Sequence, residues 1–354
     1  MGAGVALAVV ASLGACSADD GTPTLTWYIN PDAGGQERIA ASCTEAADGA
    51  YRIETTLLAR RLAASDRSLD IMSLDPPFIP ELAEPGFLAP VPDELQDTEG
   101  IVQGAVDSAS WNDELVTVPF WANTQLLWYR ESVVEEAGLD MSEPVTWDQI
   151  IEVADAGRAA AEVLQRIGEN RLGGAGLPTA NENASLNLFE GEQGSFMVNW
   201  PFVWPALNES SPEVADDLGW AVYPRMDADT PAAPPVGGIN LGVGAFSENQ
   251  DLAWQAVECI VQPENQAEYF VSDGNPPSNA AAYDDEAVQE EFPMADVIRE
   301  SLDLGVPRPQ TPYYNEISIG LQRTWHPPAG VDPDTTPETS SEFILAVLQG
   351  ERLL

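Results

Sequence analysis

Several planar polar and aromatic residues stand directly after segments whose pattern is typical of β-strands. Asn30 follows "TLTWYI", Asp75 follows "DIMSL", and Trp200 follows "GSFMVN". Trp121 and Asn123 interrupt two further strand-like runs. Carboxylate and carboxamide groups can each engage two neighbouring hydroxyls, and an indole face can stack on the C–H face of a sugar ring. These residue types therefore favour the recognition of a neutral polyol.

The stretch "NWPFVWPAL" contains Trp200 and Trp204, four positions apart, and a proline follows each of them. Either indole could fill a core or line a binding site. Because the strand-like pattern ends at Trp200, we predict that Trp200 is a stacking platform for a ligand and that Trp204 is a supporting wall. Asp75 also has a structural alternative, since a carboxylate before Pro76 and Pro77 can cap a turn.

The sequence offers little to a catalytic mechanism. His326 is the single histidine, and no G-x-S-x-G motif accompanies it, so we expect it to pack or to cap locally. "GVGAF" and "GGAG" lack the further residues that a nucleotide-binding loop needs. We therefore expect no catalytic residue, no metal and no cofactor. A secreted carbohydrate-active hydrolase is the alternative, because carboxylate pairs cannot be assigned among 58 acidic residues.

The charge balance of the chain is extreme. There are 58 acidic and 14 basic residues, a net charge of −44, and every basic residue is arginine. Such a surface repels phosphate groups, which argues against nucleic acid and anionic membranes as partners. We interpret the acidic, lysine-free composition as a means of staying soluble at high salt.

The first fifteen residues, "MGAGVALAVVASLGA", form an apolar run that is too short to span a bilayer. The run ends in Leu13-Gly14-Ala15-Cys16, which is typical of a bacterial lipobox. We therefore expect residues 1–16 to be a signal peptide and Cys16 to carry a lipid anchor. An ordinary secretory signal with a chance cysteine is the alternative.

Two cysteines remain after Cys16, and their even number suits an oxidising compartment. A disulfide between Cys43 and Cys259 is plausible, and two unpaired core cysteines are the alternative. Two widely separated cysteines do not favour a metal site.

The elements that must position these residues follow a β-α-β pattern. Residues 24–30 and 69–75 read as strands, a helix-like segment follows the first, and residues 51–65 read as a strand running into a helix. This order predicts a mainly parallel sheet. In open α/β sheets, ligands bind at the carboxyl ends of the strands, which is where the polar and aromatic residues stand.

The motifs of the chain resemble those of extracellular solute-binding proteins of ABC importers, of the carbohydrate class. "LFEGEQGSFMVNWPFVWPAL" is similar to that class's helix, F-x-x-G-x-x-A-M pattern and tryptophan-bearing segment. "AWQAVECIVQPENQAEYFVSDGNPPSN" resembles its helix pair with a Gly-x-x-Pro turn. "TWYIN", "DIMSLDPPF", "GFLAPV", "VPFWANTQLLWYR" and "PRPQTPYYNEIS" together look most like the trehalose-binding lipoproteins of actinobacteria. Two joins, near residues 58 and 157, are shorter than in that family.

The resemblance implies two α/β lobes, each a mainly parallel sheet flanked by helices, joined by a hinge. Lobe I would comprise residues 24–121 and 245–306, and lobe II residues 122–244 and 307–354. The implied ligand is a neutral disaccharide, with trehalose favoured and another oligosaccharide or polyol as the alternative. The protein would be anchored at the outer face of the cell membrane and deliver the sugar to a permease and an ATPase on other chains. The ligand-binding residues that the resemblance implies are Asn30, Asp75, Asn123, Trp200, Gly238 and Arg308, together with Gln36, Trp121 and Tyr313.

Overall fold

The structure, a computed structural model, describes residues 21–57, 67–141, 145–146, 160–170, 174, 176–191, 194–225 and 228–354. The predicted signal peptide with Cys16 and the two short joins near residues 58 and 157 lie outside these described residues. Within the described ranges, every helix is too short or too polar to cross a bilayer.

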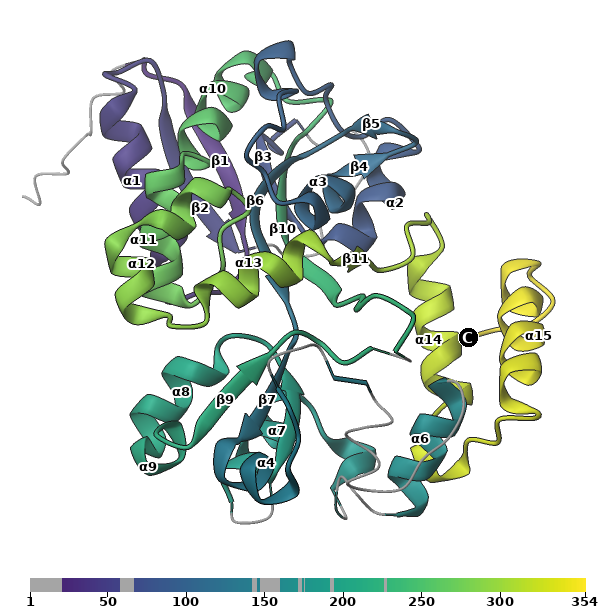
Figure 1. Cartoon of the computed structure of the whole chain (residues 1–354). Coiled ribbons are helices and arrows are strands. Elements are labelled where there is room, and N and C mark those ends of the chain that lie inside the picture. Colours follow the sequence, from purple (N-terminus) through teal and green to yellow (C-terminus); the bar gives the residue numbers. More distant parts are fainter. Residues whose placement is uncertain are drawn as a thin grey trace, which may run out of the picture.

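The larger of two bodies contains a mixed sheet, in the upper half of Figure 1. Its described strands are β1 (Thr24–Ile29), β2 (Arg52–Leu57), β3 (Ile71–Leu74), β6 (Val118–Thr124), β10 (Pro235–Val243) and β11 (Val306–Pro307). β1 runs parallel to β2 and β3, as the β-α-β pattern predicts, whereas β10 runs antiparallel to both β3 and β6. The alternation of β1 places Leu25, Trp27 and Ile29 in the core, each at most 4% exposed.

The smaller body contains β7 (Leu126–Arg130) between β8 (Phe196–Asn199) and β9 (Leu218–Ala221). The sequence predicts mainly parallel sheets in both lobes, but β7 pairs antiparallel with β8 and with β9. The register gives the reason. Tyr129, near the end of β7, lies opposite Phe196, the first residue of β8, so the intervening helices return the chain to the end at which β7 finishes.

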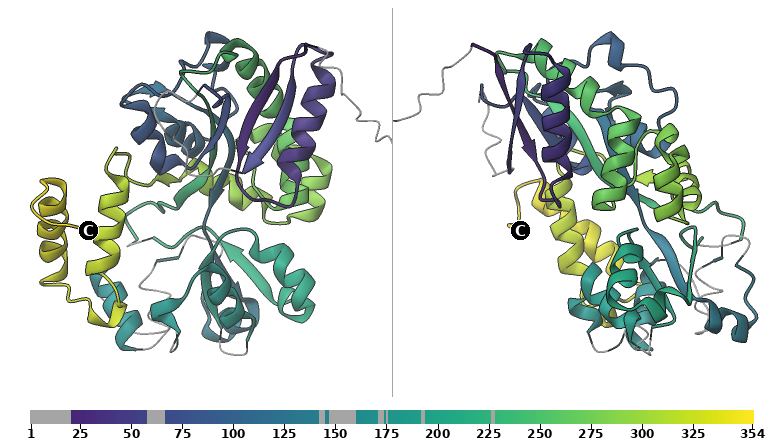
Figure 2. Two further views of the ribbon diagram at one scale, coloured as in Figure 1. Left: turned by 180° about the vertical axis from the view of Figure 1, so that it is seen from behind. Right: turned by 90° about the vertical axis from the view of Figure 1, so that its left-hand side faces the viewer.

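Helices flank both sheets (Figures 1 and 2). Those of the larger body are α1 (Gly35–Ala46), α2 (Ile79–Ala83), α3 (Gln103–Ala109), α10 (Gln250–Ile260), α11 (Pro263–Asp273), α12 (Glu286–Glu291) and α13 (Ala295–Asp303). Those of the smaller body are α4 (Glu131–Ala137), α7 (Glu182–Glu190), α8 (Val203–Ser210) and α9 (Pro212–Ala215). A third group consists of α6 (Ala160–Glu169), α14 (Tyr314–Thr324) and α15 (Thr336–Leu348). The short elements are the hairpin strands β4 (Ser110–Trp111) and β5 (Glu114–Leu115), and the 3₁₀ turns η1 (Pro76–Phe78), η2 (Asp93–Leu95), η3 (Leu177–Thr179), η4 (Ala280–Asp284) and η5 (Pro328–Gly330).

The chain passes between the two bodies from β6 to β7, from β9 to β10, and from β11 to α14 (Figure 1). β10 falls within residues 122–244, which the expected division assigns to the second lobe, yet it pairs with β3 and β6 of the larger sheet. Its run from Val236 to Val243 is almost entirely buried, because strands pair with both of its edges and its side chains enter apolar clusters with residues of the flanking helices. The larger sheet therefore takes in a strand that the sequence-based division places across the hinge.

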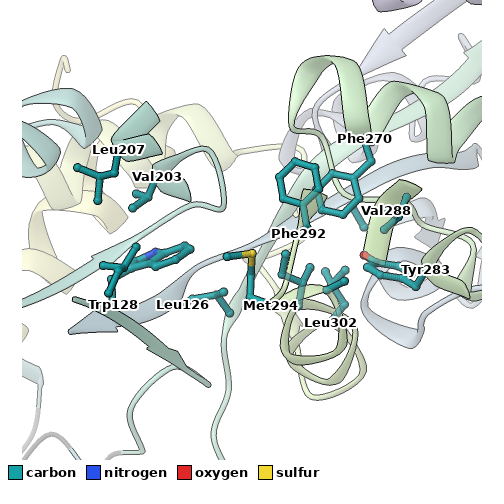
Figure 3. Packing of buried hydrophobic residues seen from close by; sticks show 14 of the residues in the cluster. Leu126, Trp128, Val203, Leu207, Phe270, Tyr283, Val288, Phe292, Met294 and Leu302 are labelled. Atoms are coloured by element: carbon teal, nitrogen blue, oxygen red, sulfur yellow. The ribbon is translucent and has the colours of Figure 1, made fainter. Parts of the chain in front are cut away.

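An apolar contact joins the two bodies (Figure 3). Leu126 and Trp128 of β7 and Val203 and Leu207 of α8 belong to the same buried cluster as residues of the larger body. The larger body contributes Phe270, Tyr283, Val288, Phe292, Met294 and Leu302 to the part of the cluster that the figure labels. Phe270 and Phe292 stack with their ring centroids 3.9 Å apart. The core is therefore continuous from one body to the other.

Cys43 of α1 and Cys259 of α10 form a disulfide bond, with their Cα atoms 5.9 Å apart. This agrees with the disulfide that the sequence analysis favours over two unpaired core cysteines. The bond joins two helices that are separated by 216 positions in the chain.

Candidate ligand-binding site

Gly237 and Gly238 lie in the part of β10 where the larger sheet comes nearest to the crossing from β6 to β7. They pair with Asn123 and Ala122 of β6. Gly238 has φ of +112°, and a Cβ atom there would lie 2.3 Å from the carbonyl oxygen of Trp121. Only glycine fits this position, so the structure gives Gly238 a backbone role in strand pairing.

Asp75 and Arg308 meet along one edge of β10. β6 pairs with the middle of β10, so β3 and β11 share the other edge. β3 is antiparallel to β10 and β11 is parallel to it, and the two strands therefore approach each other head to head. Arg308 Nη2 donates to Asp75 Oδ1 at 2.6 Å. The two side chains remain 35% and 39% exposed, so water or a ligand can still reach the pair.

The carboxylate of Asp75 is used for this ion pair rather than for capping the turn that follows it. Its side chain makes no capping hydrogen bond to η1, whose residues are all described. Burial raises the pKa of Asp75 above its ordinary value, and the Arg308 guanidinium counteracts only part of that effect. The Arg308 guanidinium therefore stabilises the ionised form of Asp75 in surroundings that disfavour its charge.

Two aromatic rings that the sequence analysis missed support Arg308. The guanidinium lies over the ring of Tyr314, 5.9 Å from its centroid, and Tyr314 meets Phe78 edge to face at 5.9 Å. The predicted residue Tyr313 is 56% exposed and directly precedes α14 as its N-cap. Two adjacent tyrosines in the sequence indicate an aromatic contact. Which of the two rings faces Arg308 depends on where α14 begins.

Trp121 and Asn123 stand two positions apart on β6, along the other edge of β10. Trp121 lies opposite Ile239 and Asn123 opposite Gly237. Asn123 Oδ1 accepts a hydrogen bond from the backbone N–H of Thr124 at 2.9 Å. Trp121 Nε1 is buried and has no hydrogen-bond partner among the described residues. A buried indole N–H in this state calls for an acceptor.

Trp200 reaches this place from the smaller body. Its backbone N–H donates to Asn199 Oδ1 at 2.9 Å. Asn199 Nδ2 donates to Glu182 O, and the Asn199 backbone carbonyl accepts from Trp128 Nε1. The indole points toward β10, because its Cη2 atom lies 3.2 Å from where a Cβ atom of Gly237 would stand. Asn199, a buried anchor at the end of β8, and Gly237 are both missing from the sequence-based prediction.

Trp204 and His326 lie elsewhere. Trp204 packs partly buried against the apolar contact, and its Nε1 donates to Glu291 O at 2.8 Å. This corresponds to the core-filling alternative that the sequence analysis leaves open for either indole. His326 Nε2 hydrogen-bonds Pro178 O, which joins the segment after α14 to η3, 148 positions away in the chain.

Gln36 and Asn30 form the deeper part of the predicted set. Gln36 is 1% exposed, and its Nε2 donates to Asn30 O and to Asp32 Oδ2, both at 3.0 Å. Ser73 Oγ donates to Gln36 Oε1 and accepts from Trp27 Nε1. Gln36 therefore joins the ends of β1 and β3 to the start of α1, and its hydrogen bonds are used within the protein.

Asn30 follows β1, which is parallel to β3, so it stands at the same sheet end as Asp75. Its Oδ1 is buried, and the described part of the chain supplies no hydrogen-bond partner for it. Two positions further along the chain, burial acts to raise the pKa of Asp32. Hydrogen bonds from Gln36 and from the Gly34 N–H outweigh burial, so the pKa of Asp32 lies below its ordinary value. The turn after β1 is thus held by an ionised carboxylate.

Strand register places Asp75, Arg308, Trp121 and Asn123 on or next to the strands that flank Gly237 and Gly238 of β10, and the Trp200 indole reaches Gly237 from the smaller body. We name these seven residues the β10 site. It combines an ion pair, a carboxamide and two indoles, which are groups that bind hydroxyls and stack on sugar rings. A separate surface cavity of about 470 Å³ lies near the β4–β5 hairpin and is lined by Ala83, Leu88–Val91, Gln96 and Asp113–Val116, none of them in the β10 site.

Comparison with known proteins gives a family and several relatives. The model of the family described as bacterial extracellular solute-binding protein matches residues 53–267 of this chain. A probable ABC transporter-binding protein from Deinococcus radiodurans is 28% identical over 147 residues, which is 41% of this chain. The match spans about a third of that relative's own length, 35%.

Solved structures share the fold at low sequence identity. Maltose-bound MalE3 of T. maritima superimposes with a TM-score of 0.72 at 20% identity, over 93% of this chain and 100% of that one. The sugar-binding protein MalE from Xanthomonas citri gives 0.73 at 16% identity, over 92% and 96%. A solute-binding protein of Agrobacterium vitis with bound D-mannitol gives 0.70 at 18% identity, over 93% and 98%. These values establish the two-lobed, MalE-like α/β fold.

Proposed function

The chain belongs to the family of bacterial extracellular solute-binding proteins, and on that premise we propose that it binds a neutral saccharide or polyol at the β10 site for uptake by an ABC importer. Trehalose is the ligand we favour, on the resemblance of the motifs. Another oligosaccharide or a polyol is the alternative within the same class.

One observation carries the proposal: groups from both bodies stand along the same stretch of β10, where the Trp200 indole approaches Gly237 and the flanking strands β3 and β6 carry polar and aromatic residues. Trp200 comes from the smaller body, and Asp75 and Trp121 come from the larger one. A ligand in contact with both sets would favour the arrangement of the bodies in which all contacts are made. It can shift that equilibrium only by its differential affinity for the two arrangements.

The polar atoms near the site support a ligand that carries hydroxyl groups. Trp121 Nε1 needs an acceptor and Asn30 Oδ1 needs a donor, and neither has a partner among the residues described. A hydroxyl can serve as both donor and acceptor. A sugar or a polyol presents several hydroxyls at once, so one molecule could satisfy groups of both kinds.

The charges of the site support a neutral ligand. Asp75 and Arg308 neutralise each other at 2.6 Å, while the whole chain carries a net charge of −44. An anionic ligand would have to compete with Asp75 for the arginine and overcome the acidic surface. A neutral ligand needs only to add hydrogen bonds to an existing pair, and hydrogen bonds to charged groups contribute more than neutral ones.

We further propose that residues 24–121 with 245–306 and residues 122–244 with 307–354 approximate the two lobes, with β10 reaching back into the larger sheet. The permease and the ATPase would be separate chains, and Cys16 would anchor the protein to the outer face of the cell membrane. The solved relatives with maltose and with D-mannitol bound support a saccharide or polyol as the class of ligand and binding without catalysis as the activity.

A calorimetric screen of trehalose, maltose, sucrose and mannitol tests this function. We expect saturable heat with at least one of them, and no cleavage of the disaccharides when the reaction mixtures are separated by chromatography. Turnover would favour the alternative of a carbohydrate-active hydrolase. Absence of binding to all four would contradict the assignment of the ligand class.

A further inference from the structure

Trp200 and Gly237 stand on either side of the short passage of the chain from β6 to β7. Asn123, near the end of β6, lies opposite Gly237 of β10. Leu126, at the start of β7, lies opposite Asn199, the residue before Trp200. Only two residues separate Asn123 from Leu126. The crossing therefore fixes Trp200 of the smaller body against Gly237 of the larger one.

The contact between them depends on the missing side chain. A Cβ atom at Gly237 would lie 3.2 Å from Cη2 and 3.4 Å from Cζ3 of Trp200. These two atoms form the far edge of the six-membered ring, so the indole meets the β10 backbone end on. Because φ of Gly237 is outside the left-handed region, alanine could adopt the same backbone, and the added methyl would act on the indole alone.

We propose that Gly237 is a positioning residue: its lack of a side chain seats the edge of the Trp200 indole on β10 and thereby sets the plane in which the indole faces a ligand. The effect on binding rests on the proposed function, but the contact between the Trp200 indole and Gly237 exists without a ligand. It adds a residue that neither the sequence nor its resemblance to the family brought forward.

Gly242 provides a matched control on the same strand. A Cβ atom there would lie 3.0 Å from Leu74 Cδ1, 3.1 Å from Leu88 Cδ2 and 3.3 Å from Thr117 Cγ2, all of them the ends of side chains. Gly242 pairs with Met72 of β3, well away from Trp200. Gly242→Ala therefore adds the same methyl to β10 under similar crowding without touching the indole.

The first test needs no ligand. The protein is labelled with 5-fluorotryptophan, and the fluorine NMR signal of Trp200 is assigned by its loss in Trp200→Phe. We expect Gly237→Ala to move this signal and Gly242→Ala to leave it in place. A Trp200 signal that is unchanged in Gly237→Ala would overturn the proposal, whether or not any sugar binds.

The second test is a double-mutant cycle on trehalose affinity measured by calorimetry. Overpacking of this kind leads us to expect about tenfold weaker binding in Gly237→Ala. The effect should vanish when Trp200→Ala is already present, because neighbours in contact are not additive. An equal loss in both backgrounds would overturn the role of Gly237 in binding. If wild-type protein binds none of the four screened ligands, the proposed function fails. The fluorine experiment would still show whether Gly237 positions the Trp200 indole.

Discussion

The two bodies meet in two regions of opposite character. In the apolar contact, Phe292 and Met294 of the larger body share a buried cluster with Leu126 and Val203 of the smaller one, and each is at most 1% exposed. In the β10 site, half-buried polar and aromatic side chains meet around two glycines. The apolar contact is complete without a ligand, because its stabilisation comes from surface already removed from water.

The β10 site, by contrast, contains polar groups that are exposed to solvent or lack a hydrogen-bond partner among the described residues. The Asp75–Arg308 pair is more than a third exposed on average, and Trp121 Nε1 is buried without a partner among the described residues. Exposed ion pairs contribute little to stability, and an unpaired buried donor reduces it. We therefore expect substitutions in the apolar contact to change the free energy of unfolding, and substitutions in the β10 site to change the affinity for the ligand.

The largest expected effect is on the apolar contact. Phe292→Ala removes a ring that is 1% exposed and stacked on Phe270. We expect the free energy of unfolding to fall by about 3–5 kcal/mol, measured by urea denaturation. Saccharide affinity at a temperature where the variant is folded should change less than about twofold, within the scatter expected for distant sites. A large loss of affinity with little loss of stability would reverse the comparison.

Trp200→Ala tests the β10 site. If the indole stacks on a sugar ring, the binding free energy should weaken by about 1–3 kcal/mol, measured by calorimetric titration. Trp111→Ala is the control, since Trp111 donates to Glu84 in the hairpin region and takes no part in the site. Unchanged affinity in a folded Trp200→Ala protein would remove Trp200 from the site.

Asp75 gives the site a pH dependence. Because burial raises its pKa above the ordinary value of 3.8, Asp75 should take up a proton at a higher pH than a solvent-exposed aspartate. As the pH falls through this raised value, Arg308 loses its partner and saccharide affinity should fall, by up to about tenfold for one charge-assisted hydrogen bond.

The same shift has the opposite sign for folding. A raised pKa means that the native protein binds the proton more tightly than the unfolded chain, so this contribution to stability is present at low pH and is lost as the pH rises through the native value. Asp75→Asn should abolish both trends. Affinity and urea denaturation measured from pH 7 downward in the two proteins would check them, and identical profiles would exclude Asp75 as the titrating group.

The smallest expected effect belongs to Trp204. Trp204→Phe keeps a ring against the apolar contact but removes the hydrogen bond from Nε1 to Glu291 O, which joins α8 to the end of α12. We expect the free energy of unfolding to fall by about 0.5–1.5 kcal/mol and the affinity to stay the same. If affinity changes and stability does not, Trp204 belongs to the binding machinery and the two regions are not separate.

The sequence predicted those features that depend on local pattern. Alternation in "TLTWYI" identified β1 and its buried face, and the end of each strand identified where Asp75 and Trp200 would lie. The antiparallel smaller sheet was not predictable, because β8 and β9 have only four residues each and a short run carries no sign of its direction. The order of strands around β10 was equally hidden.

Long-range contacts set the limit for the site. Asp75 and Arg308 are 233 positions apart, and only the head-to-head approach of β3 and β11 makes them partners. The resemblance to the family brought Arg308 and Gly238 into the prediction, but the contact of the Tyr314 ring with Arg308 depends on how α14 begins. Gln36 has a side chain suited to binding, but its bonds to Asn30 and Asp32 are visible only in three dimensions.

A crystal structure of the protein with the saccharide that binds most tightly in the calorimetric screen tests the central claim most directly. The account predicts that the sugar lies against the Trp200 indole, with its hydroxyls on the Asp75–Arg308 pair and on Asn123. A sugar bound at any other surface, with the β10 site unoccupied, would contradict it.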